Sequence, residues 1–87
     1  MIRIRVVGNG ETIFTVSGRM RSENLAELRD LIEAEGESRH MALDLKELML
    51  VDRDAVRFLK RCESNGMELR NCSAYIRAWI TREPDAE

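Results

Sequence analysis

Apolar and polar residues alternate in four short segments of the chain, and this period of two predicts four half-buried strands. The segments are residues 2–7, 12–17, 41–45 and 67–70. In the first segment Ile2, Ile4 and Val6 fall on one face, opposite the arginines between them. Gly8-Asn9-Gly10 supplies the residues of a tight turn, so the first two strands are expected to form a hairpin. Gly18 is expected to end the second strand.

Three other segments carry apolar residues at helical spacing, which predicts three amphipathic helices. Their inward stripes are Leu25, Leu28, Leu31 and Ile32; Ala55, Val56, Leu59 and Cys62; and Ile76, Trp79 and Ile80. Ser22, Asp52 and Ser73 stand where the N-cap of each helix is expected. Gly36 is expected to stop the first helix and Asn65-Gly66 to close the second.

The order strand, strand, helix, strand, helix, strand, helix predicts a β-β-α-β-α-β-α superhelix with right-handed crossovers. The strands are not apolar throughout, as strands covered on both faces would be. Charged residues stand opposite the core face, namely Arg3, Arg5, Glu68 and Arg70. We therefore expect an α/β fold with a four-stranded mixed sheet and helices on one face. Residues 1–82 should form one domain, and residues 83–87 a disordered acidic tail.

Composition narrows the classes of partner and compartment. The 87 residues include 14 Lys and Arg against 16 Asp and Glu, so the chain lacks the positive field that nucleic acid requires. No apolar run approaches the roughly 20 residues of a membrane span, and the alternating N-terminus is unlike a signal peptide. These features predict a cytoplasmic protein without nucleic-acid partners or direct membrane insertion.

The residues that most often carry metal or nucleophilic chemistry are few. Cys62 and Cys72 lack the paired spacing of a zinc site, and we interpret them as buried free thiols. His40 is the single histidine, and no potential metal ligands accompany it at suitable spacing, so it is interpreted as a turn residue. The sequence therefore predicts no metal site and no cofactor.

Asp44 and Asp52 admit two interpretations. As a carboxylate pair they could serve acid-base chemistry or bind magnesium, as in phospho-receiver domains, which makes a small enzyme one alternative. Receiver domains also need a lysine late in the sheet, whereas no lysine follows Lys60. The favoured interpretation is structural, with Asp44 forming a hydrogen bond at a strand end and Asp52 capping a helix.

Three stretches of the sequence carry short motifs of one domain family, at residues 14–20 with Asn24 and Leu28, at residues 42–45 and 51–59, and at residues 65–69. They resemble the STAS domains of bacterial anti-sigma factor antagonists. The opening of that domain is matched by Phe14-Thr15-Val16-Ser17-Gly18-Arg19-Met20, with Asn24 and Leu28 after it. Its centre is matched by Ala42-Leu43-Asp44-Leu45 and by Val51-Asp52-Arg53-Asp54-Ala55-Val56-Arg57-Phe58-Leu59. Asn65-Gly66-Met67-Glu68-Leu69 resembles the family's glycine and the strand that follows it.

The resemblance implies a signalling protein that regulates transcription by binding another protein, without catalysis. Family members dock on an anti-sigma factor that is also a kinase, and phosphorylation of the serine after the second Asp switches them off. In this chain Arg53 occupies that serine position, beside Asp52 and Asp54, so the usual phosphoacceptor is absent. These three residues are the predicted partner-binding loop. The implied partner is an anti-sigma factor or a kinase-like ATPase domain.

Two further possibilities accompany this interpretation. Some STAS proteins bind transporter ATPases, so an accessory subunit of a lipid-transport system is an alternative. Tyr75 and Trp79 belong to an apolar cluster near the C-terminus and are a candidate second surface for a partner. The same surface could hold a second copy of the chain, which leaves a homodimer open.

Overall fold

The computed structural model describes residues 2–8, 11–34 and 41–84. Along the chain it contains β1 (Ile2–Gly8), β2 (Thr12–Met20), the 3-10 helix η1 (Ser22–Asn24), α1 (Leu25–Ala34), β3 (Met41–Asp44), β4 (Leu48–Val51), α2 (Arg53–Ser64), β5 (Glu68–Arg70) and α3 (Ala74–Arg82). The predicted α/β class is confirmed. Gly36 and His40 lie outside the described residues, as do Asn9 and Gly10 of the predicted turn.

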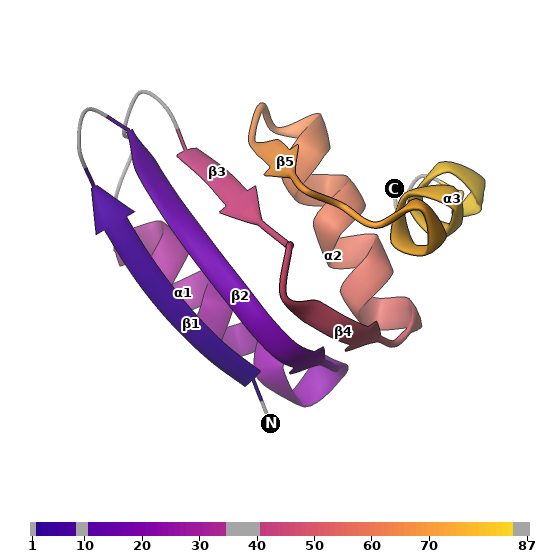
Figure 1. Cartoon of the computed structure of the whole chain (residues 1–87), viewed down its shortest axis with the longest axis horizontal. Coiled ribbons are helices and arrows are strands. Elements are labelled where there is room, and N and C mark those ends of the chain that lie inside the picture. The colour runs from indigo at the N-terminus through magenta and orange to yellow at the C-terminus, as the bar shows by residue number, and fades with distance from the viewer. Residues whose placement is uncertain (1, 9–10, 35–40, 85–87) are drawn as a thin grey trace.

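The strands form one mixed sheet of five strands, not the four that the sequence predicted. β1 pairs antiparallel with β2, β3 and β4 both pair parallel with β2, and β5 pairs parallel with β3. Figure 1 shows α1 and α2 behind this sheet and α3 beside α2. The strand that the sequence did not predict is β4, which lies between the third predicted strand and the second predicted helix.

β3 and β4 share one edge of β2. Thr12–Thr15 of β2 pair with β3, whereas Gly18–Met20 pair with β4, and the register shifts between Gly18 and Arg19. Gly18 has a φ of 95°, a conformation that glycine adopts without steric cost. The prediction that Gly18 ends the strand was therefore wrong, because this residue forms an irregularity through which β2 continues to Met20.

One hydrophobic core lies between the sheet and the helices. Its largest fully buried side chains are Phe14, Met20, Leu28, Leu43, Leu45, Leu59, Ile76 and Ile80. The inward residues predicted for the second helix are all buried, and the remaining stripe residues Leu25, Leu31, Ile32 and Trp79 pack partly buried against the core. The helical periodicity therefore identified the core-facing sides of the helices correctly.

Two of the three predicted helix caps are confirmed. The carboxylate of Asp52 accepts a hydrogen bond from the Ala55 amide, and the Ser73 hydroxyl accepts one from the Ile76 amide. At the end of α2, Gly66 takes the expected left-handed conformation, with a φ of 100°. The prediction for Ser22 was wrong, because this residue is already the first residue of η1.

Candidate functional site

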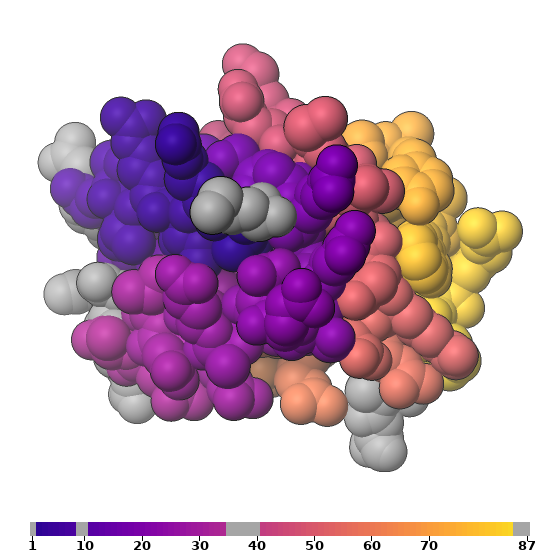
Figure 2. Space-filling model, turned by 90° about the horizontal axis from the view of Figure 1, so that it is seen from below, coloured from indigo at the N-terminus to yellow at the C-terminus, as the bar shows by residue number. Residues whose placement is uncertain are grey.

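The start of α2 is joined to the end of β2 through Asp52. One carboxylate oxygen, Oδ1, accepts a hydrogen bond from the Ala55 amide at 2.9 Å and so caps α2. The other, Oδ2, accepts a hydrogen bond from the Ser22 amide, also at 2.9 Å. The Asp52 amide itself donates to the carbonyl of Met20 at 3.3 Å. Asp52 therefore fixes the two segments against each other, and Figure 2 shows the end of β2 and η1 lying beside the start of α2 on one face.

Arg53 and Arg57 of α2 hold the acidic residue that follows α3. Their Nε atoms lie 3.2 and 3.0 Å from the same Oε2 atom of Glu83. The Glu83 side chain is only 5% exposed, whereas that of Arg53 remains 64% exposed. The hydrogen bond from Arg57, together with the one from Arg53, holds the pKa of Glu83 below its usual range. Glu83, which the sequence assigned to the acidic tail, thus fastens the end of α3 to α2.

The three residues of the predicted binding loop have different surroundings. Both carboxylate oxygens of Asp52 accept hydrogen bonds from backbone amides. Arg53 bonds to Glu83 through Nε while most of its side chain stays exposed. Asp54 is exposed in the first turn of α2. Of the three, Arg53 and Asp54 are therefore the ones whose side chains another molecule can contact.

Sequence reasoning missed two exposed apolar residues that directly precede this loop. Met49 and Leu50 of β4 are 75% and 43% exposed, between the buried residues Leu48 and Val51. A continuous apolar run predicts burial, so the sequence gives no sign of this exposure. The exposed residue Arg19 pairs with Leu50 in the sheet. We define the β4–α2 surface as the residues Arg19, Met49, Leu50, Arg53 and Asp54.

Asp44 has the structural role that was favoured for it. Its Oδ1 atom accepts hydrogen bonds from the side-chain amide of Asn71 and the backbone amide of Lys46, both at 3.1 Å. These two bonds, the first being the larger cause, lower the pKa of Asp44. Asn71 follows β5 in a left-handed conformation with a φ of 56°. Asp44 therefore joins the ends of two neighbouring parallel strands, β3 and β5.

The structure gives Asp44 and Asp52 separate hydrogen-bond partners. Asp44 bonds at the end of β5, whereas Asp52 bonds to η1 and to the first turn of α2. Over residues 2–8, 11–34 and 41–84, no group of three or more His, Cys, Asp or Glu side chains could hold a metal ion.

Tyr75 and Trp79 are neighbours on α3. Their ring centroids lie 6.1 Å apart with the ring planes at 59°. Tyr75 is 58% exposed, whereas Trp79 is half-buried and packs against the core. Most of the apolar surface that this pair offers to another molecule therefore comes from the tyrosine.

The two cysteines differ in exposure, and both are free thiols. Cys62 is buried on the inward side of α2, and burial raises the pKa of its thiol to about 12. Cys72 lies in the link between β5 and α3 and is only half-buried. The prediction of two buried thiols is thus confirmed for Cys62 and wrong for Cys72.

No protein-family model matches this sequence, and no curated protein matches it either. The resemblance to STAS domains therefore stands on the sequence motifs. Among the described residues, no helix has the length and apolar character that crossing a membrane requires.

Proposed function

We propose that this chain is a regulatory protein-binding domain of the anti-sigma factor antagonist type, and that it binds its partner through the β4–α2 surface. The observation that carries the proposal is the exposure of Met49 and Leu50 beside the charged start of α2. Burial of an exposed Met or Leu side chain contributes about 1.5–3 kcal/mol. Since both side chains are only partly exposed, together they offer a partner roughly 2–3 kcal/mol of binding free energy.

The chemistry of the surface fits a protein partner. Interfaces commonly have an apolar centre with a polar rim, and the methionine side chain adapts readily to the shape of a partner. Here Met49 and Leu50 supply the apolar part, and Arg19, which pairs with Leu50 in the sheet, supplies a positive charge beside it. Arg53 and Asp54, which follow β4 in the chain, add exposed charges of both signs. A partner with a small apolar pocket flanked by opposite charges is the complement of this surface.

The geometry of Asp52 also favours binding. Its two hydrogen bonds, to the Ala55 and Ser22 amides, hold the start of α2 in place before any partner arrives. Less conformational entropy is then lost on binding than for a loose loop. The binding residues Arg53 and Asp54 follow directly along the helix.

The family resemblance indicates the partner class, an anti-sigma factor or a kinase-like ATPase domain. In the resembling proteins a serine at this helix start is the phosphorylation switch, and here Arg53 stands in its place. Arginine has no hydroxyl group, so the proposed binding is not switched off by phosphate at this position. The proposal assigns no catalytic step to the chain.

Site-specific photo-crosslinking in the native host tests the proposal. A photoreactive residue at position 49 should capture a protein with an anti-sigma or kinase-like ATPase domain. The same residue at Ala26, exposed on α1, should not capture it. Capture of a lipid-transport ATPase from position 49 would replace the proposed partner class with the alternative one.

With the purified partner, the contribution of individual surface residues to binding can be measured from the Kd of variants. Met49→Ser should weaken binding by roughly 5- to 30-fold, since about 1–2 kcal/mol of apolar burial is lost. Asp54→Lys should weaken it several-fold by altering charge complementarity. Glu27→Lys, the matched charge change on α1, should leave the Kd unchanged, and all three variants should keep the thermal stability of the parent. Unchanged Kd values for both surface variants would refute the proposed docking site, and loss of binding in Tyr75→Ser would move it to α3.

A further inference from the structure

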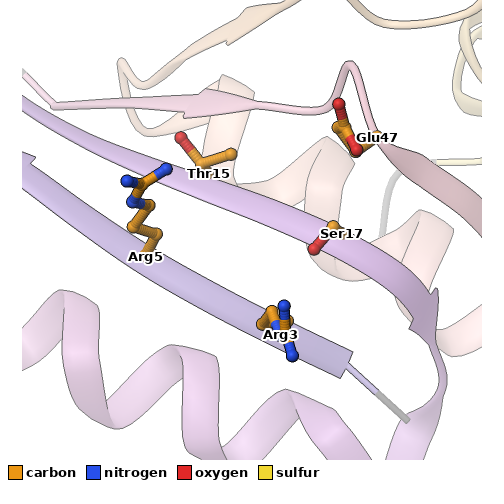
Figure 3. A pocket seen from close by; sticks show the side chains of 5 residues that line it. All are labelled: Arg3, Arg5, Thr15, Ser17 and Glu47. Atoms are coloured by element: carbon orange, nitrogen blue, oxygen red, sulfur yellow. The ribbon is translucent and has the colours of Figure 1, made fainter.

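The face of the sheet opposite α1 and α2 contains a hollow of about 280 Å³. Figure 3 shows the five side chains that line it, which are Arg3, Arg5, Thr15, Ser17 and Glu47. In the antiparallel register Arg3 lies opposite Ser17, and Arg5 lies opposite Thr15. The short hydroxyl side chains of β2 form the floor, the long arginines of β1 form one side, and Glu47 lies on the other.

Within the described residues, the charged side chains around this hollow have no hydrogen-bond or ion-pair partner. These side chains are those of Arg3, Arg5 and Glu47. By contrast, Arg70 bonds to Glu11 and Glu68, and Arg77 bonds to Glu63 through both of its terminal nitrogens. The two guanidinium groups and the carboxylate are therefore available to a ligand.

Two guanidinium groups and two hydroxyls form a set of donors suited to an oxyanion. Each guanidinium can donate two parallel hydrogen bonds to a phosphate, and such charge-assisted bonds are the strong ones. Thr15 and Ser17 add hydroxyl donors between the arginines and Glu47. A phosphate monoester carries a charge of about −1.5 to −2 at pH 7, which the two arginines would balance.

Glu47 narrows the class of ligand further. A purely anionic ligand, or an acidic protein segment lying across the hollow, would bring its negative charges against this carboxylate. A ligand that also carries a positively charged group would form an ion pair with the Glu47 carboxylate instead. We propose that this hollow binds a small phosphate monoester that carries an amino group, with the phosphate on Arg3 and Arg5 and the ammonium on Glu47.

The size of the hollow agrees with this class of ligand. Pockets for drug-sized molecules run from about 300 to 1,000 Å³, so a volume of about 280 Å³ suits a smaller metabolite. The hollow shares no residue with the β4–α2 surface, although Ser17 and Glu47 stand only two positions from Arg19 and Met49 in the sequence. The inference does not rest on the proposed partner, because its observations concern the five lining residues alone.

Titration of the full chain with three small molecules, followed by NMR of the backbone amides, tests the inference. The probes are O-phosphoethanolamine, ethyl phosphate, which lacks the amino group, and ethanolamine, which lacks the phosphate. O-phosphoethanolamine should shift the amides of β1 and β2 and bind several-fold more tightly than ethyl phosphate, while ethanolamine alone should not bind. Failure of both phosphate esters to shift these amides at millimolar concentration overturns the proposal.

Variants of the lining residues test which side chains bind the phosphate and which one binds the ammonium group. Arg5→Gln should weaken both phosphate esters about tenfold, equivalent to about 1.4 kcal/mol, and Arg3→Gln provides the same test if the first variant does not fold. Arg29→Gln on α1 removes the same charge outside the hollow and should leave both affinities unchanged. Glu47→Gln should abolish the preference for O-phosphoethanolamine over ethyl phosphate.

Two further results, one from the variants and one from titration with an acidic peptide, would overturn the proposal. If Arg29→Gln weakens binding as much as Arg5→Gln does, the arginines act only through net charge. If an acidic peptide shifts the β1 and β2 amides while the phosphate esters do not, the open face is a protein-binding surface and not a metabolite site.

Discussion

Replacing Asp52 with alanine removes two hydrogen bonds at once, and each joins a different part of the chain. Oδ1 caps α2 through the Ala55 amide, and Oδ2 holds the Ser22 amide, 30 residues earlier in the sequence. Ser73, the cap of α3, accepts a single hydrogen bond at 3.3 Å from the Ile76 amide. Ser73→Ala is therefore a matched control that loses a cap without a second bond.

The expected loss of unfolding free energy in each variant follows from the number of hydrogen bonds that it removes. Loss of an N-cap costs about 1 kcal/mol, within a range of roughly 0.5–2. The bond from Ser22 adds about 1 kcal/mol, because this amide is near solvent and can exchange its partner for water. Asp52→Ala should thus lower the free energy of unfolding by about 2 kcal/mol and Ser73→Ala by about 1.

Asp52→Asn separates the two bonds. The Ala55 and Ser22 amides bond to different oxygens of Asp52, and asparagine replaces one of these oxygens by an NH2 group that cannot accept a hydrogen bond. In the same side-chain position, Asp52→Asn therefore keeps only one of the two bonds. Its expected cost is about 1 kcal/mol, midway between the parent and Asp52→Ala. In a domain of this size 1 kcal/mol corresponds to a change in Tm of roughly 4–8 °C, so the parent, Asp52→Asn and Asp52→Ala should be readily resolved from one another.

Urea unfolding followed by circular dichroism measures these differences, and amide hydrogen exchange locates them. In Asp52→Ala the Ser22 and Ala55 amides should both exchange faster, and in Asp52→Asn one of them should keep its protection. If Asp52→Ala costs no more than Ser73→Ala, the bond to Ser22 contributes nothing. Asp52 would then be an ordinary helix cap that does not hold the proposed β4–α2 surface in place before a partner binds.

Three further predictions concern the core, the ion pairs of α2 and the thiols. Leu59→Ala should lower the free energy of unfolding in urea by about 2–5 kcal/mol, because Leu59 is fully buried. Since the folded chain lowers the pKa of Glu83 from its usual 4.5, its ion pairs stabilise the fold above that pH and lose this effect as the pH falls through the lowered value. Glu83→Gln should therefore be less stable than the parent at neutral pH, with a difference that narrows in acid. A thiol reagent should label Cys72 faster than Cys62, which is buried and has a pKa of about 12.

Each of these predictions has a clear contrary result. A cost below about 1 kcal/mol for Leu59→Ala would mean that the core around α2 collapses to fill the space. A stability difference between Glu83→Gln and the parent that stays constant down to acid pH would exclude the ion pairs as its source. Equal labelling rates for the two cysteines, measured in the folded chain, would mean that α2 opens as readily as the link before α3.

Local patterns in the sequence were enough to predict most of the secondary structure. Period-two alternation marked β1 as a strand, and its first residues alternate as predicted, with Ile2 and Ile4 packed partly buried against the core. Val6, which was expected on the same face, is instead 41% exposed. Capping chemistry placed the starts of α2 and α3 at Asp52 and Ser73, because a cap acts on amides only a few residues away. Gly66 marked the end of α2 for an equally local reason, the left-handed conformation of its own backbone.

The arrangement of β2 depended on contacts between distant segments. The sequence predicts that Gly18 ends a strand, because glycine weakens the interior of a strand. Its actual role depends on β3 and β4, which pair with successive parts of one edge of β2 and require a register shift between them. The run Leu48–Val51 gave no alternation by which a strand could be recognised.

The candidate binding surface was predicted only in part. The sequence identified the start of α2 from its capping residue and its neighbouring charges, Arg53 and Asp54. Burial depends on which segments of the folded chain pack over a residue. The exposure of Met49 and Leu50 and the burial of Glu83 are therefore known only from the tertiary structure. Hydrophobicity is a property of a single residue, whereas exposure depends on neighbours that the chain brings together from far apart. For this protein the sequence by itself determined the helices, two of their three caps and four of the five strands, and the tertiary structure decided which side chains remain exposed to another molecule.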